Sequence, residues 1–412
     1  MKSHSHKIYM SGRLHLCLTA FFLFLLFAAR FIPQEKIQEH RALSLQLLSE
    51  FPENSYLPGS APALKSETEF LNSLDENPEY STLWNTLLGQ DQGFRWNGMQ
   101  ALARPLLCFF HIGQIRYLCM IFFFMLLFWA AWSVGKHFSA PYGFFFLFFF
   151  LWADILPVSW LLPQTGCYLT AFGAILFLCK KNSYFREENR YKLFLTFYGI
   201  GTAAAFLDTG TVPVLTLGLA LTVAFLFFRN QIPRQKDSVI RKSLTGCALF
   251  LLLGYLLMAV TKWLLTILIT GKNLFPAYLA RIKGYCFASS LSAGSLKTVL
   301  FENLSGFLSH VGFGKKILLV LMLAIFVIYL ILFFTGHKSR QTCIRNLPLI
   351  FIGMLPFLSY LLAPAHGLSE SAVTFRALTA AFWPWMLFFY SMLDLPQIRR
   401  SLHTIWNSAG RN

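Results

Sequence analysis

Long apolar runs alternate with short polar stretches along most of this sequence. A helix needs roughly 20 mostly apolar residues to cross a bilayer, and ten runs approach that length. They cover residues 14–31, 117–134, 138–156, 160–179, 191–206, 212–228, 244–265, 317–334, 347–363 and 377–393. The pattern predicts an all-α fold: a polytopic integral membrane helix bundle with about ten spans and a helical extracytoplasmic loop between the first two.

Composition supports a membrane protein. The 412 residues are 56% hydrophobic and only 13% charged, which leaves too little polar surface for a soluble protein. The 45 Phe, 10 Trp and 15 Tyr suit acyl chains and the aromatic belts of the two interfaces. The net charge of +17 lies in short clusters between apolar runs and matches no nucleic-acid-binding pattern. We therefore expect membrane lipid as a partner and no nucleic acid.

Positive residues resist translocation, so clusters of Lys and Arg predict the orientation of the spans. The clusters are Lys2, Lys7 and Arg13; Lys180, Lys181, Arg186, Arg190 and Lys192; Arg229, Arg234, Lys236, Arg241 and Lys242; Lys338, Arg340 and Arg345; and Arg399 and Arg400. They alternate with apolar runs in a way that requires an even number of spans. The prediction is a multi-pass protein of a bacterial plasma membrane with both termini cytoplasmic.

The runs divide the chain into an anchor, two outer loops and two parts of a bundle. The predicted units are an N-terminal anchor span (1–31), an extracytoplasmic helical loop (32–116), the first part of the bundle (117–270), a second extracytoplasmic loop (271–316), the last three spans (317–393) and a cytoplasmic tail (394–412). The first run also has the basic start and short core of a cleaved signal peptide. Ala28-Ala29-Arg30 is a poor cleavage site, so an anchor is the preferred interpretation.

The first outer loop contains an acidic connector. Ser66 and Glu69 form a capping box that opens one short helix. Asn77 followed by proline starts a second helix, through residues 83–88. Asp75 and Glu76 then lie at the break between the helices, where they could accept hydrogen bonds or bind a cation. A solvated turn is the alternative.

Cationic and other ionisable residues are expected near the outer ends of the spans. Arg95, Trp96, Arg104 and Arg116 approach the second span, where arginines bind a phosphate in bidentate fashion or anchor the chain among lipid headgroups. Ionisable groups at membrane depth are costly and tend to be functional or internally paired. Six polar residues share the predicted outer level and indicate an outward-facing polar cavity: Asp154, Asp208, Lys262, His366, Glu370 and Arg376.

Several common chemistries have no motif here. The chain contains no GxxxxGK[ST] phosphate loop, no HExxH, no GxSxG and no EF-hand loop. Its eight cysteines include no CxxC pair, and most lie in or beside apolar runs, where cysteine behaves as a small hydrophobe. The sequence therefore predicts neither an ATPase nor a cysteine zinc site.

The layout resembles the GT-C superfamily of polytopic lipid-dependent glycosyltransferases, and short motifs resemble a poorly characterised Gram-positive bacterial branch. The motifs are FRWNG at 94–98, LARPLL at 102–107, FLDT at 206–209 and TFR at 374–376. The resemblance implies transfer of a sugar from a polyprenyl-phosphate donor to an acceptor outside the membrane, in envelope glycan assembly. Arg95, Arg104 or Arg376 would face the donor phosphate. Asp75, with Glu76 as second choice, would act as general base or hold a divalent cation.

The chain departs from the pattern of that branch at two positions. Asn97 and Glu370 stand where histidines are expected, which raises the alternatives of a transporter or flippase for a lipid-linked or amphiphilic substrate and of a non-catalytic envelope assembly partner. The residues predicted to bind substrate are Arg95, Trp96, Arg104, Arg116, Asp208, His366 and Arg376.

Overall fold

Every apolar run of the sequence lies in a helix of the computed structural model. The structure describes residues 2–50, 67–75, 81–88, 94–207, 213–231, 237–286, 293–309, 315–338 and 340–401. The runs correspond to α1 (Lys2–Arg30), α6 (Ile112–His137), α7 (Ala140–Trp152), α9 (Leu162–Lys180), α10 (Arg190–Leu207), α11 (Pro213–Gln231), α12 (Asp237–Thr270), α15 (Lys315–Thr335), α16 (Arg340–Gly353) with α17 (Leu355–Leu362), and α20 (Thr379–Met392). Within these ranges there is no strand, so the all-α fold is confirmed.

Shorter helices form the connections. They are α2 (Gln34–Glu50), a helix over residues 67–72, α4 (Thr82–Leu88), α5 (Gln100–Leu107), α8 (Leu156–Trp160), α13 (Phe275–Cys286), α14 (Ala293–Ser309), α18 (Pro364–Ser369), α19 (Ser371–Thr374) and the 3-10 turns η1 (Asn182–Phe185), η2 (Glu187–Asn189) and η3 (Phe375–Leu378). The predicted helix through residues 83–88 is therefore present as α4. The capping serine, Ser66, and the Asn77 cap lie outside the described residues.

Six helices among the described residues are long and apolar enough to cross a bilayer. These are Met10–Arg30, Ile112–His137, Leu162–Lys180, Pro213–Asn230, Asp237–Thr270 and Arg340–Leu362. Helix α7 and residues 326–335 are apolar but shorter. Length and composition thus indicate a membrane protein with several spanning helices.

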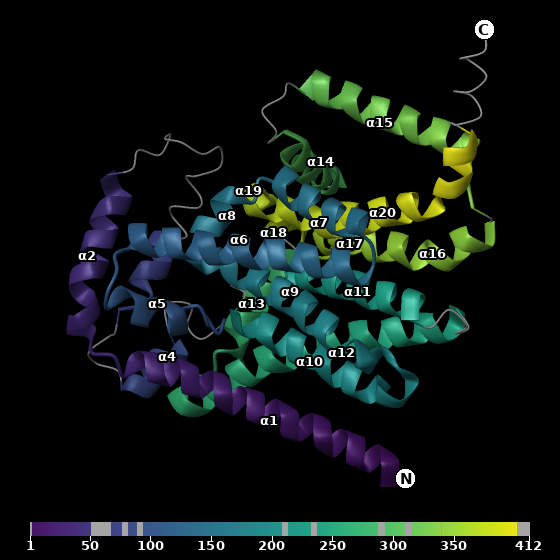
Figure 1. Ribbon diagram of the computed structural model, residues 1–412. Helices are drawn as coiled ribbons and strands as arrows, with labels where there is room; N and C mark the ends of the chain where they lie inside the picture. Colours follow the sequence, from purple (N-terminus) through teal and green to yellow (C-terminus); the bar gives the residue numbers. More distant parts are fainter. Residues whose placement is uncertain are drawn as a thin grey trace.

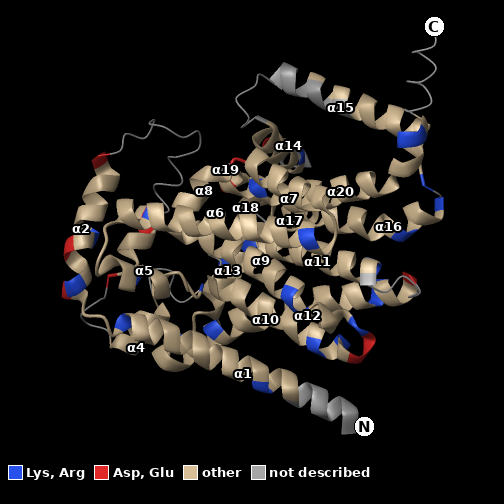
Figure 2. Cartoon of the chain, viewed as in Figure 1, with Lys and Arg blue, Asp and Glu red and all other residues tan. Residues whose placement is uncertain are grey.

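The long helices run side by side, with α1 beginning and α20 ending at the same end of the bundle (Figure 1). Helix α2 lies across their direction at the opposite end, as a helix in an interfacial loop would. Figure 2 shows many of the Lys and Arg residues at the end where α1 begins. The turns η1 and η2 after α9 and the start of α12 lie there too, so the described members of several basic clusters gather at one end of the bundle.

Close backbone contact joins α10 to α12. A Cβ atom at Gly201 of α10 would collide with the carbonyl of Leu251, and one at Gly254 of α12 with the carbonyl of Tyr198. Small residues allow such approach between membrane helices, where packing and not the hydrophobic effect drives association. This pair forms one wall of the cavity described next.

Candidate functional site

A cavity of about 330 Å³ lies between α10–α13, α17, α18 and residues 94–96. Its walls are mostly aromatic and aliphatic side chains, including Trp96, Trp263 and Tyr360. Arg95 and His366 also line it, from positions 271 residues apart in the chain. The structure therefore brings together three of the predicted substrate-binding residues: Arg95, Trp96 and His366.

The loop that carries Arg95 is held on both sides. The Trp96 indole, 2% exposed, donates its Nε1 hydrogen to the Met258 carbonyl of α12 at 2.8 Å. The Gly98 amide donates to the Phe206 carbonyl of α10 at 2.9 Å, and a Cβ atom there would clash with Phe206. Asn97 has a φ of +52°, a conformation that asparagine tolerates better than most residues. Asn97 thus shapes the backbone between two anchor points.

The polar part of the cavity centres on the hydroxyl of Tyr285. Arg95 donates from Nη2 to this oxygen at 2.8 Å, and Arg281 donates from Nε at 3.2 Å. The His366 ring meets the Tyr285 ring edge to face, with centroids 5.3 Å apart. Two guanidinium groups on one neutral oxygen concentrate positive charge at the edge of an apolar space. Of the described residues that line the cavity, none is a carboxylate.

Sequence reasoning missed Arg281 and Tyr285. They lie four residues apart in α13, within the predicted second outer loop, so they share one side of that helix. The spacing of four residues between the arginine and the tyrosine was the sequence signal that could have identified this pair. The guanidinium of Arg281 also lies 4.8 Å from the centre of the Phe94 ring.

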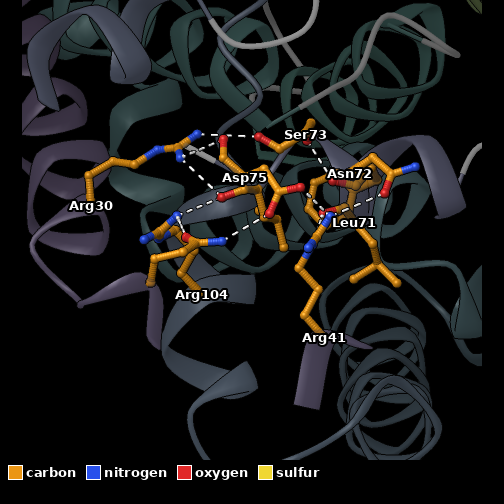
Figure 3. Close-up of polar contacts among 10 residues, drawn as sticks. Arg30, Arg41, Leu71, Asn72, Ser73, Asp75 and Arg104 are labelled. Carbon is orange, nitrogen blue, oxygen red and sulfur yellow. Dashed lines mark hydrogen bonds and ion pairs between the residues drawn. The ribbon is translucent and has the colours of Figure 1, made fainter. Parts of the chain in front are cut away.

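Asp75 belongs to a separate cluster, in which three arginines surround the segment 71–75 (Figure 3). Its carboxylate is paired with Arg41 and accepts a 3.0 Å hydrogen bond from Gln34. Arg30 donates to the carbonyls of Ser73, Leu74 and Asp75. Cations suit the carbonyl end of a helix. We call Arg30, Arg41 and Arg104 the arginine clamp.

Arg104, one of three predicted phosphate ligands, is the most buried member of the arginine clamp. Its side chain is fully buried, and it donates to the carbonyls of Ala29 (3.0 Å), Ile32 (2.9 Å) and Leu74 (2.7 Å). Arg104 thus lies against the segment that carries Asp75, but its guanidinium is occupied mainly by backbone acceptors. These contacts tie the end of α1 to the segment 71–75.

Arg116 and Arg376 each have a carboxylate partner. Arg116 of α6 is paired with Glu67, whose side chain is fully buried. Arg376 of η3, 4% exposed, donates from Nε to the Asp154 carbonyl at 3.0 Å, and its Nη2 lies 3.8 Å from the Asp154 carboxylate. Burial lowers the pKa of Arg376, while Tyr168 and Asp154 raise it. Both contacts involve connecting segments, and that of Arg376 brings together two of the six residues expected at one level, Asp154 and Arg376.

Two predicted residues lie outside the described residues: Glu76 and Asp208. In the part of the chain that the structure describes, no three His, Cys, Asp or Glu side chains are grouped closely enough to hold a metal ion. Lys262, 1% exposed, lies 5.1 Å from the Trp96 ring and donates to the Thr86 carbonyl at 3.5 Å. The buried Lys262 side chain thus packs against Trp96 in the loop that carries Arg95.

Comparison of the chain with models of protein families, with curated proteins and with solved structures finds no match in any of the three. The chemistry of the cavity itself is therefore the basis for a function.

Proposed function

We propose that the protein is a membrane glycosyltransferase-like protein that takes a polyprenyl-phosphate-linked sugar into the cavity beside Arg95. In this proposal the chain makes ten spans in a bacterial plasma membrane, with both termini cytoplasmic and the cavity facing outward. The supporting observation is the convergence of Arg95, Tyr285 and His366, from three distant segments, on one otherwise apolar space.

The chemistry of the cavity suits an anionic amphiphile. A phosphate at Arg95 would replace the phenol oxygen of Tyr285 as acceptor, and charge-assisted hydrogen bonds to a phosphate are the stronger kind. The aromatic walls would hold the first part of the lipid, while the sugar would lie toward His366. During transfer the phosphate leaves with the bonding electron pair, so donors already in place stabilise the charge that develops.

A transferase also needs a group that accepts the proton of the attacking hydroxyl. Asp75 remains the first candidate and Glu76 the second. Asp208 follows Ala205 and precedes Pro213, both of which line the cavity, so it is a third carboxylate to test.

A specific observation favours a second function, a carrier or flippase for the same class of lipid. The described cavity-lining residues provide no carboxylate, and Asp75 is engaged with Arg41 and Gln34. Moving an amphiphile across the membrane requires a binding site but no base, because no bond is broken. The third alternative, an assembly partner, would use the cavity without turnover.

The experiment measures lipid binding and sugar transfer separately in reconstituted full-length protein. Arg95→Gln should weaken binding of polyprenyl phosphate by roughly tenfold or more, since a charge-assisted hydrogen bond contributes about 1.5–3 kcal/mol. Lys283→Gln is the matched control, because it removes one charge from an exposed position of the same helix. Unchanged binding in Arg95→Gln would overturn the proposal.

Transfer distinguishes the two functions. With a labelled polyprenyl-phosphate sugar in vesicles, Asp75→Asn, Glu76→Gln and Asp208→Asn are compared for release of the sugar to acceptor. Loss of transfer with binding intact identifies a catalytic carboxylate. Lipid movement between leaflets that continues in all three variants, with no transfer in the native protein, identifies the carrier.

A further inference from the structure

A second cavity, of about 440 Å³, lies at the other end of the bundle. Helix α11 contacts both α12 and α16, and Figure 1 shows it between them. Leu221 of α11 lines the cavity from this central helix, and residues of α12 and α16 form its two sides. We call this cavity the inner groove, since it lies where α11 ends and α12 begins, far along the chain from the Arg95 loop.

The polar end of the inner groove is cationic. Arg241 and Thr245 line it from α12, and Arg345 lines it from α16. The single acidic residue among the lining residues is Asp237, whose Oδ2 lies 3.7 Å from Nε of Arg345, beyond hydrogen-bond distance. Arg229, at the end of α11, interacts electrostatically with both. Three guanidinium groups against one carboxylate leave a net positive site.

Among the described residues, one donor in this site has no hydrogen-bond acceptor. Nε of Arg345 is buried and makes no hydrogen bond to them, although the side chain as a whole is 39% exposed. A buried donor without an acceptor costs free energy, more when the group is charged. An anionic oxygen placed at this nitrogen would remove that cost and would also meet Arg241.

The remainder of the inner groove is apolar. Along α12, Leu244 and Ala248 continue the lining from Arg241; seven residues of helix extend it about 10 Å toward the middle of the membrane. On the opposite side the lining continues from Arg345 through Phe351 and Ile352 to Leu355. A charged head region followed by an apolar channel of this length is the shape of a membrane lipid.

We propose that the inner groove binds an anionic glycerophospholipid from the leaflet at the basic end of the bundle. Its phosphate accepts hydrogen bonds from Arg345 and Arg241, and one acyl chain lies between α12 and α16. A free phosphate would meet only the polar end and would leave the apolar lining unfilled. This site is independent of the Arg95 cavity and of the reaction proposed for it.

Binding is tested on the full chain, stripped of lipid in detergent, by native mass spectrometry during titration with phosphatidylglycerol or phosphatidylcholine. We expect one strongly bound phosphatidylglycerol and weaker phosphatidylcholine. Arg241→Gln with Arg345→Gln should weaken phosphatidylglycerol binding roughly tenfold or more. The control, Lys180→Gln with Lys181→Gln, removes the same charge from exposed positions outside the groove and should leave binding unchanged.

Two further variants separate this site from general surface charge. Asp237→Asn frees Arg345 from its acidic neighbour and should tighten phosphatidylglycerol binding, a gain that a damaged fold does not produce. Ala248→Trp fills the apolar part and should weaken lipid binding without altering any charge. Equal losses in the lysine control, equal affinity for both lipids, or binding unaffected by Ala248→Trp would each overturn the proposal.

Discussion

Removing the guanidinium of Arg116 leaves a carboxylate buried without its partner. The side chain of Glu67 is fully buried and that of Arg116 is 16% exposed, so solvent reaches the arginine end of the pair only. Arg116 binds the carboxylate through Nε, at 3.1 Å from Oε2, and through Nη2. In Arg116→Ala the carboxylate keeps its place in the fold and loses both donors.

The expected loss in the free energy of unfolding is about 3–5 kcal/mol at neutral pH, the usual cost of breaking a buried ion pair from one side. Burial raises the pKa of Glu67 above its ordinary value of 4.5, although Arg116 lowers it. The folded protein thus binds this proton more tightly than the unfolded chain, and stability falls as pH rises from 4.5 through the raised folded pKa. Without Arg116 that pKa rises further, so the deficit shrinks in acid by up to about 1.4 kcal/mol per pH unit.

The assay is thermal or denaturant unfolding of the purified protein in detergent, at neutral and at acidic pH. Glu67→Gln with Arg116→Ala is the matched control, because it removes the buried charge and should recover much of the loss. Compared with Glu67→Gln alone, the double variant should show a deficit that does not depend on pH between these conditions. A deficit that is the same at both pH values, and unchanged by Glu67→Gln, would refute the reasoning.

Two other predictions concern buried polar contacts. Arg104→Lys keeps the charge but loses the planar donors that reach three carbonyls, so its free energy of unfolding should fall by about 2–4 kcal/mol; unfolding in detergent measures this, and a native-like midpoint would contradict the clamp. His15→Phe removes the contacts of its ring with Tyr198 (2.7 Å) and Thr261 (2.8 Å), and should cost about 1–2 kcal/mol, since such bonds are modest inside membranes. Unfolding in detergent also measures this loss, and a larger loss in His15→Phe than in Arg104→Lys would contradict the prediction.

The helices were predictable because each apolar run is long enough to need internal hydrogen bonding of its backbone. Their number as spans was not, because helices such as α7, with 13 residues, and α20, with 14, are shorter than a straight crossing requires. The effect of proline on a helix also depends on its position: Pro384 lies inside α20, whereas Pro163 lies in the first turn of α9. Local sequence does not decide how such helices tilt or pair.

The candidate site was predictable in its residue types and only partly in its geometry. Arg95 and His366 were expected at one level and do line one cavity. Arg104 was expected to meet a phosphate, but its acceptors are main-chain oxygens, which sequence patterns do not reveal. Arg30 was overlooked because it ends an apolar run, where a cation usually marks only the edge of a span.

The arginine clamp imposes an order on biosynthesis. Ala29 and Arg104 are 75 residues apart, and translation at about 5–20 residues per second separates their synthesis by roughly 4–15 s. Throughout that interval the Ala29 carbonyl lacks the Arg104 donor, and its partner among the described residues is the Ile32 amide at 3.4 Å. Arg30 and Arg41 can contact the segment 71–75 as soon as it is synthesised, whereas the contacts that Arg104 makes with Ala29 and Leu74 form only after α5 has emerged.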